Sequence, residues 1–161
     1  MIEIGSLDDF CAEMQRLGAA IEVSSEQMPH CGATSAAGYH VTTGSDGSYV
    51  FVYSERGVPD VVAASPDAAV LMERVFIEVT AGIAIAAIAD GLPLYDASEE
   101  RRQAQLSESD RDQAINYRLQ LSRIQEELLG NLDPAWRQRQ SERNAERLRQ
   151  TKEFFSEGPE D

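Results

Sequence analysis

The chain contains very few of the residues on which metal sites, disulfide-rich scaffolds and thiol enzymes depend. Among its 161 residues there are two cysteines, two histidines, one tryptophan and one lysine. Cys11 and Cys31 are too few to predict a disulfide framework. Neither belongs to a C-x-x-C or H-x-x-x-H pattern, and the adjacent His30 and Cys31 are poorly spaced to chelate one ion. We therefore expect no metal.

Motifs for catalysis and cofactor binding are missing as well. Gly44 and Gly47 form neither a G-x-G-x-x-G nor a Walker loop, and no lysine lies near them, so they are interpreted as turn glycines. His40 falls in a predicted strand, where a half-buried structural histidine is more common than a general base. A Cys–His nucleophile would need a third, orienting group that no local motif supplies. We predict no catalytic residue, no cofactor and no enzyme activity.

Positive charge is scarce, with 14 Lys and Arg against 28 Asp and Glu and a formal net charge of −14. Nucleic-acid binding requires clustered Lys and Arg, which this chain lacks. An anionic membrane surface would repel such a chain. We therefore expect neither partner. The acidity is consistent with two alternatives, simple solubility or steering towards a basic protein surface.

Long hydrophobic runs are also absent. The longest uncharged apolar run, residues 79–89, is too short to span a bilayer and is bordered by Glu78 and Asp90. The first residues lack the basic and apolar regions of an export signal. These features predict a cytoplasmic location.

The sequence does contain a β-hairpin followed by a third strand. Two runs of aromatic and β-branched residues, 39–42 and 49–53, flank an Asp46-Gly47 pair. Such a pair accepts the positive φ of a tight hairpin turn. The second run is apolar on both faces and is predicted to be central in its sheet. Residues 58–64 form the third predicted strand.

Helices are predicted on both sides of these strands. The first begins at the N-cap Ser6 and stops at Gly18, and a short strand is expected over residues 20–23. The second begins at Ser65-Pro66-Asp67, with the serine as its cap. Apolar residues nearly encircle this second helix, so it should be buried on most sides.

Beyond residue 96 the composition shifts to Arg, Gln, Glu and Ser. A helix is predicted over residues 107–129, ending at Gly130, and another begins at Asp133-Pro134. The first of them carries a narrow apolar seam with heptad-like spacing. The seam consists of Ala114, Tyr117, Leu121, Ile124 and Leu128. It fits two alternatives: packing on its own domain, or a homodimer through the 107–129 helix.

These elements predict an α+β fold: a small antiparallel sheet packed on one long apolar helix, with an N-terminal helix and a helical C-terminal tail. We expect two regions, an α+β domain over residues 1–95 and a charged helical extension over 96–161. The first region has a net charge of −10 and the second −4. The partner-binding surface is therefore expected in residues 1–95.

Within this region, one segment is similar to a known family. An aromatic strand runs into Ser54-Glu55-Arg56, a second strand ends in Ala-Ala-Ser at residues 63–65, and a helix carries Met-Glu-Arg-Val-Phe at 72–76. In order and spacing, residues 39–83 resemble the bacterial polymorphic-toxin immunity proteins. That family includes the antitoxin of the mycobacterial tuberculosis necrotizing toxin.

The resemblance implies a cytoplasmic inhibitor that blocks the active site of a cognate secreted toxin, with NAD hydrolysis as one chemistry of such toxins. An immunity protein has no chemistry of its own, which agrees with the lack of catalytic motifs. The alternative is an acidic chaperone or adaptor of a bacterial secretion system. A chaperone wraps an extended segment of its client, whereas an immunity protein binds a folded toxin domain.

The predicted partner-binding residues lie on the second strand, in the turn after it and at the start of the third strand. They are Tyr49, Tyr53, Glu55, Arg56 and Asp60. The two tyrosines are candidate anchors, because tyrosine is enriched in binding hot spots. The alternative for the tyrosines is a core position with the hydroxyl at the rim. The three charged residues form a candidate polar contact patch.

Overall fold

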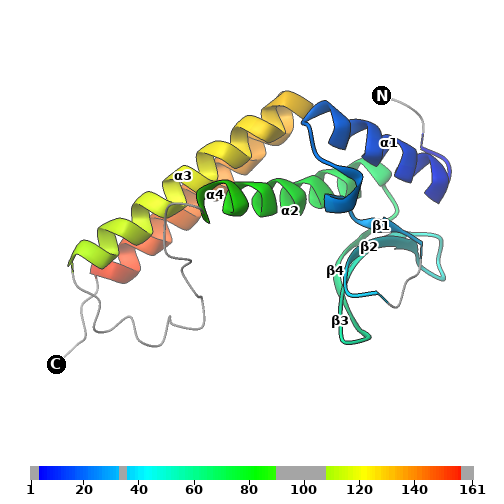
Figure 1. Cartoon of the computed structure of the whole chain (residues 1–161), viewed down its shortest axis with the longest axis horizontal. Helices are drawn as coiled ribbons and strands as arrows, with labels where there is room; N and C mark the ends of the chain where they lie inside the picture. The colour runs from blue at the N-terminus through cyan, green and yellow to red at the C-terminus, as the bar shows by residue number, and fades with distance from the viewer. Residues whose placement is uncertain (1–3, 33–35, 90–107, 157–161) are drawn as a thin grey trace. The chain divides into compact units, whose positions relative to one another are not determined.

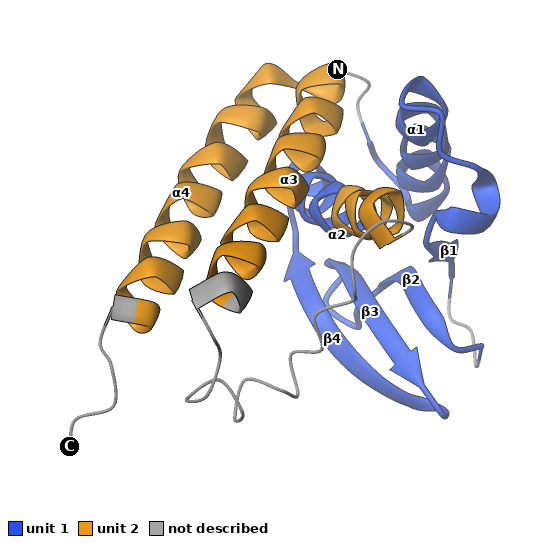
Figure 2. Ribbon diagram, turned by 60° about the vertical axis from the view of Figure 1, so that its left-hand side comes forward, with its two compact units in different colours: residues 1–79 blue, residues 80–161 orange. Residues whose placement is uncertain are grey.

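The structure is a computed structural model that describes residues 4–32, 36–89 and 108–156 (Figure 1). The chain divides into two compact units, residues 1–79 and residues 80–161 (Figure 2). This division falls inside a helix. The boundary predicted between residues 95 and 96 lies outside the described residues.

The described part of the chain has a mixed α+β fold, as predicted. Its elements are α1 (Leu7–Ala20), the 3-10 helix η1 (Ser25–Gln27), β1 (His30–Cys31), β2 (Gly38–Thr43), β3 (Tyr49–Glu55), β4 (Val58–Ser65), α2 (Ala68–Ala89), α3 (Glu108–Leu132) and α4 (Pro134–Ser156). No helix in the described ranges is both long and apolar enough to cross a membrane.

One four-stranded sheet has the order β1-β2-β3-β4. The β2–β3 and β3–β4 pairs are antiparallel, and β3 is an inner strand, as its apolar faces predict. The prediction of a wholly antiparallel sheet is wrong, because β1 pairs with β2 in parallel. β1 has only two residues and lies in a stretch that reads as a loop, so its pairing depends on tertiary contacts.

The predicted hairpin turn between β2 and β3 is confirmed. Gly44 N–H donates to the carbonyl of Ser48 at 2.8 Å. Asp46 Oδ1 accepts from the backbone N–H and from the hydroxyl of Ser48, at 3.0 and 2.6 Å. Gly47 has φ +81°, the left-handed conformation that favours glycine. These hydrogen bonds hold the pKa of the Asp46 carboxyl below its usual range.

α1 begins as predicted but ends later. Ser6 is its N-cap, and Ser6 Oγ accepts from the N–H of Asp9 at 3.1 Å. The helix continues through Gly18 to Ala20 and closes in a Schellman motif, with Glu22 at φ +61° and Val23 N–H bonded to Gly18 O at 3.0 Å. The strand predicted over residues 20–23 is therefore wrong.

Gly18 has a packing role in place of the predicted stop. It is buried, and a Cβ at this position would lie 2.8 Å from Met28 Sδ. The absence of a side chain lets the segment after η1 pack directly against α1. Met28 itself is buried.

The core of the first unit lies between the sheet, α1 and the part of α2 up to Val79. Its fully buried large side chains are Phe10, Met14, Val41, Phe51, Leu71, Val75 and Phe76. Phe10 of α1 stacks on Tyr49 of β3 with ring centroids 5.2 Å apart. Within this unit, α1 and the part of α2 up to Val79 lie on the same side of the sheet in Figure 2.

Cys11 of α1 and Cys31 of β1 form a disulfide, with their Cα atoms 6.2 Å apart. Two cysteines do not make a framework, but this pair makes one covalent link between the first helix and the sheet edge. It also accounts for both cysteines of the chain, so no free thiol is left as a nucleophile or metal ligand. Disulfides are rare in the cytosol and persist in oxidising compartments. The link therefore disagrees with the predicted cytoplasmic location.

The cap of α2 is Asp67, two residues after the predicted Ser65. Asp67 Oδ1 accepts from Ala69 N–H at 2.8 Å, and Ser65 Oγ accepts from Asp67 N–H at 3.0 Å. The serine thus supports the turn that presents the capping carboxylate. A carboxylate here also interacts favourably with the helix dipole.

Replacement of this cap gives a first testable prediction. Asp67→Ala should lower the free energy of unfolding by about 1 kcal/mol, because a backbone N–H of the first turn loses its acceptor. Asp67→Asn, which keeps an acceptor oxygen, is the matched control and should cost less. Urea denaturation followed by circular dichroism measures both. Equal stability of Asp67→Ala and the wild type would show that solvent replaces the cap at no cost.

In the second unit, α3 and α4 form an antiparallel helical hairpin (Figures 1 and 2). Asp133 caps α4, as predicted: its Oδ1 accepts from Ala135 N–H at 2.7 Å. Gly130 does not end α3, which continues to Leu132. A Cβ on Gly130 would lie 2.9 Å from Arg137 Cδ, so the glycine accommodates the side chain of the next helix.

The contact between α3 and α4 has a polar centre. Gln140 Nε2 donates to Gln125 Oε1 at 3.1 Å and to Asn144 Oδ1 at 2.9 Å, and all three side chains are buried. Asn144 Nδ2 in turn donates to Glu126 Oε1 at 2.9 Å. Because buried amides need partners, this network fixes the register of the two helices. Along the seam, Ala114 is buried, and the other four residues are partly exposed. A homodimer through the 107–129 helix, the second alternative for the seam, stays a prediction.

Candidate protein-binding surface

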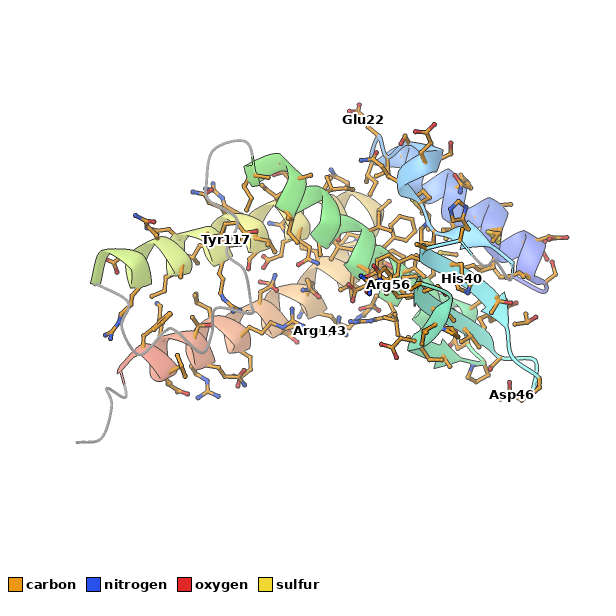
Figure 3. All side chains as sticks on the ribbon, turned by 60° about the horizontal axis from the view of Figure 1, so that its bottom comes forward. Glu22, His40, Asp46, Arg56, Tyr117 and Arg143 are labelled. Carbon is orange, nitrogen blue, oxygen red and sulfur yellow. A yellow bond between two sulfur atoms is a disulfide. The ribbon has the colours of Figure 1, made fainter. Side chains whose placement is uncertain are left out.

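Four of the five predicted contact residues gather where β3 turns into β4. Tyr53 ends the aromatic part of β3, Glu55 and Arg56 enter the turn, and Asp60 lies on β4 opposite Tyr53. All four are exposed. Figure 3 labels Arg56 at this turn and Asp46 at the turn before β3. The structure thus brings these residues together at one end of the hairpins.

A row of side chains crosses three strands at this end. Tyr39 of β2 pairs with Tyr53 of β3, which pairs with Asp60 of β4. Since directly opposed residues share a face, Tyr39, Tyr53 and Asp60 project on the same side of the sheet; we call them the tyrosine row. The two rings lie 4.9 Å apart, and Tyr39 also stacks on the buried Phe51 at 5.1 Å.

The tyrosine row is both exposed and held in place. Tyr39 is 38% and Tyr53 is 37% exposed. Each ring leans on another aromatic ring, so few rotamers are lost when a partner binds, and such aromatic pairs contribute roughly 0.5–1.5 kcal/mol beyond their area. A pre-ordered aromatic pair next to charged residues is the arrangement found at binding hot spots.

The Tyr39 hydroxyl lies close to charged groups of α2. Burial raises the pKa of its hydroxyl above the usual value of 10.0, and the negative charge of Glu78 adds to this, with a smaller contribution from Tyr53. Arg74 acts in the opposite direction. The neutral hydroxyl can donate a hydrogen bond to a partner or accept one.

The turn between β3 and β4, beside the tyrosine row, has an unusual backbone conformation and exposed side chains. Arg56 has φ +51°, unusual for a residue with a side chain, and Gly57 follows with φ +77°. Val58 is 70% exposed next to them. Glu55 pairs with Val58 across the hairpin, so both lie on the face of the tyrosine row. This turn therefore exposes the guanidinium of Arg56, the carboxylate of Glu55 and the apolar side chain of Val58.

Tyr49 does not belong to this surface, which corrects its predicted role as an anchor. It is only 8% exposed and stacks on Phe10 of α1. Tyr49 shares a face with Tyr53, but α1 covers its end of the strand. The alternation of side chains along β3 predicts that Tyr49 and Tyr53 share a face. It does not predict that α1 covers Tyr49, because the position of α1 depends on tertiary packing.

The two histidines were the other candidates considered from sequence. No group of three or more His, Cys, Asp and Glu that could hold a metal is found in the described part of the chain. His40 is 5% exposed, and its Nδ1 has no hydrogen-bond partner among the described residues. His30, its neighbour on β1, is exposed.

Tyr39 is a further candidate contact residue, outside the five that were predicted. The predicted hairpin turn could have indicated it. When residues 44–48 form the turn, Tyr39 lies opposite Tyr53 on the neighbouring strand. Comparison with models of known protein families gives no matching family, and comparisons with curated proteins and with solved structures give no match.

Proposed function

We propose that this protein is an immunity protein, an inhibitor that neutralises a cognate protein toxin by binding and blocking its active site. The observation that carries the proposal is the exposed tyrosine row, stacked on a buried core ring and flanked by Glu55 and Arg56. The resemblance of residues 39–83 to immunity proteins of polymorphic toxins agrees with this function.

Charge supports the same proposal. A chain with a net charge of −14 is steered towards basic surfaces, and an active site that binds an anionic substrate such as NAD offers one. Asp60 and Glu55 can pair with cations around such a cleft while the tyrosines fill it. Inhibition of this kind needs no catalytic group in the inhibitor.

The disulfide bears on where the inhibitor acts. A secreted toxin can be neutralised in the cytoplasm of the producing cell or in an oxidising compartment outside it. The Cys11–Cys31 bond favours the second location.

Co-expression with the product of the adjacent gene tests the proposal. We expect growth rescue and nanomolar binding, and we expect Tyr53→Ala to raise Kd roughly 30-fold, about 2 kcal/mol, as for a hot-spot residue. Val61→Ala is the matched control, because Val61 follows Asp60 on β4, is 60% exposed and projects from the opposite face. Its Kd should change less than about twofold.

Two results would redirect the assignment. If neither rescue nor binding is seen with any neighbouring toxin, the immunity function is wrong. If the chain instead captures a non-toxic secreted protein that unfolds without it, the function is that of an acidic chaperone or adaptor. Equal binding by Tyr53→Ala and the wild type, with rescue intact, would move the contact away from the tyrosine row.

A further inference from the structure

The helical hairpin of the second unit contains an open groove whose lining includes no residue of the tyrosine row. It has a volume of about 620 Å³ and runs between α3 and α4, along residues 114–122 and 144–155. At about 1.5 Å per helical residue, these segments are about 12 and 17 Å long. The volume is within the range of about 300–1,000 Å³ that is typical of binding pockets.

The groove lining includes large apolar side chains from both helices. Leu121 and Leu148 contribute from opposite helices, and Phe154 and Phe155 line its end. Phe154 is 58% exposed and Leu119, also in the lining, is 44% exposed. Large apolar side chains exposed together in a concave surface mark a binding site more often than scattered ones do.

The charges in the groove have one sign. Arg118 and Arg147 are among the described residues that line it, and none of those residues is acidic. The structure gives neither guanidinium an ion pair with a described residue. By contrast Arg149, outside the groove, is paired with both Glu146 and Glu153, at 2.6 and 2.7 Å. The α4 carboxylates are thus engaged elsewhere, and the groove arginines are available.

A third arginine lies at the end that Phe155 lines. Arg111 Nη1 donates to the carbonyl of Phe155 at 3.2 Å, and its guanidinium carbon is 6.0 Å from the ring centroid. Its Nε is buried and has no hydrogen-bond partner within the described ranges. The Arg111 guanidinium adds positive charge beside this end of the groove.

We propose that this groove binds an acidic amphipathic helix of a partner protein. Such a helix places leucine-like side chains between α3 and α4 and carboxylates against Arg118 and Arg147. A helix satisfies its own backbone hydrogen bonds, whereas an extended segment would find no strand edge here to bond with. The length of the groove accommodates two to three helical turns.

Two other occupants fit the charges less well. A second copy of the hairpin would bring identical arginines into the same symmetric contact. Nucleic acid has anionic phosphates, but a chain with a net charge of −14 repels it outside the groove. A short acidic helix can pair with Arg118 and Arg147 and carries far fewer negative charges than nucleic acid. The acidic remainder of the chain therefore repels it less.

The experiment uses the full-length chain and a synthetic probe. The probe is a fluorescein-labelled helical peptide of about 15 residues, with leucine at every third or fourth position and glutamate between them. A second peptide carries lysine in place of glutamate. Fluorescence anisotropy should give saturable binding of the acidic peptide with Kd on the order of 10 µM, and at least about tenfold weaker binding of the basic one.

Charge-matched variants locate the binding. The double variant Arg118→Glu/Arg147→Glu should bind the acidic peptide at least about tenfold more weakly than the wild type does. It should bind the basic peptide more tightly. The controls are Arg123→Glu on α3 and Lys152→Glu on α4, which change exposed cations that do not line the groove. Their combination should change Kd less than about twofold. The reversal of preference distinguishes a binding role from a purely structural one.

Phe154→Ala tests the apolar part of the groove. Since Phe154 is exposed, its loss should leave the fold intact and weaken the acidic peptide about tenfold. The proposal is overturned if the acidic peptide shows no saturable binding, or if the groove and control variants bind it equally. It is also overturned if sedimentation shows a dimer that dissociates on Phe154→Ala, because a second copy is then the occupant.

Discussion

Removal of the Cys11–Cys31 disulfide should lower the free energy of unfolding of the first unit by about 3 kcal/mol. The two cysteines are 20 residues apart in the sequence, and cross-linking a loop of this length restricts the unfolded chain by about that amount. The link also joins α1 to the short strand β1, which has few other contacts to hold it. Loss of the link should therefore loosen β1, whereas α1 stays packed through the buried Phe10 and Met14.

The measurement compares urea denaturation of the wild type, with and without a thiol reductant, and of the Cys11→Ser/Cys31→Ser variant. The reduced wild type and the double variant should unfold at the same lower midpoint. Reductant should have no effect on the double variant, which serves as the control. A double variant as stable as the oxidised protein would mean that the bond adds nothing to stability.

Phe76→Asp has the second large expected effect. Phe76 has no exposed surface in the centre of α2, so an aspartate there must be buried as a charge or take up a proton. Either costs several kcal/mol in addition to the lost apolar burial. Since a domain of this size is stabilised by only about 5–15 kcal/mol, we expect the first unit to unfold.

Val70→Asp is the matched control for this substitution. Val70 lies in the first turn of the same helix and is 58% exposed. A carboxylate there interacts favourably with the helix dipole, so the stability should change by less than about 0.5 kcal/mol. Circular dichroism and thermal denaturation measure both variants. A Phe76→Asp protein with a native spectrum and an unchanged melting temperature would show that α2 does not hold the core.

Local features of the fold were predictable because they depend on neighbouring residues. Ser6 and Asp133 cap their helices as expected, and Asp46-Gly47 forms the hairpin turn. Each uses a side chain and backbone groups within three residues of each other. The same reasoning places Tyr53 and Arg56 on one end of β3.

Features that depend on distant residues were not predictable in this way. The parallel pairing of β1 and the disulfide join parts of the chain that no local pattern connects. Gly18 has the composition of a helix stop, but it provides space for Met28 inside a longer helix. Tyr49 and Tyr53 are equivalent by alternation, and only the position of α1 makes one buried and the other exposed.

The groove between α3 and α4 could not be predicted from the sequence for a related reason. The apolar seam of α3 was visible, but the sequence of α4 is largely polar and gave no sign of a partner helix. Its packing depends on Gln140 and Asn144, whose amides are satisfied only when Gln125 and Glu126 face them. Polar residues read as surface thus form the centre of the hairpin.

The edges of the sheet determine how this protein behaves at high concentration. β1 is too short to serve as a template for another strand. On the opposite edge, β4 begins with Val58, Pro59 and Asp60, and the β3–β4 ladder shifts register at Phe51 and Val52. A proline and a charge on an irregular edge discourage pairing with a second chain. We therefore expect the protein to resist fibril formation and domain exchange. We also expect its partners to bind to the faces of the sheet and not to add a strand to its edge.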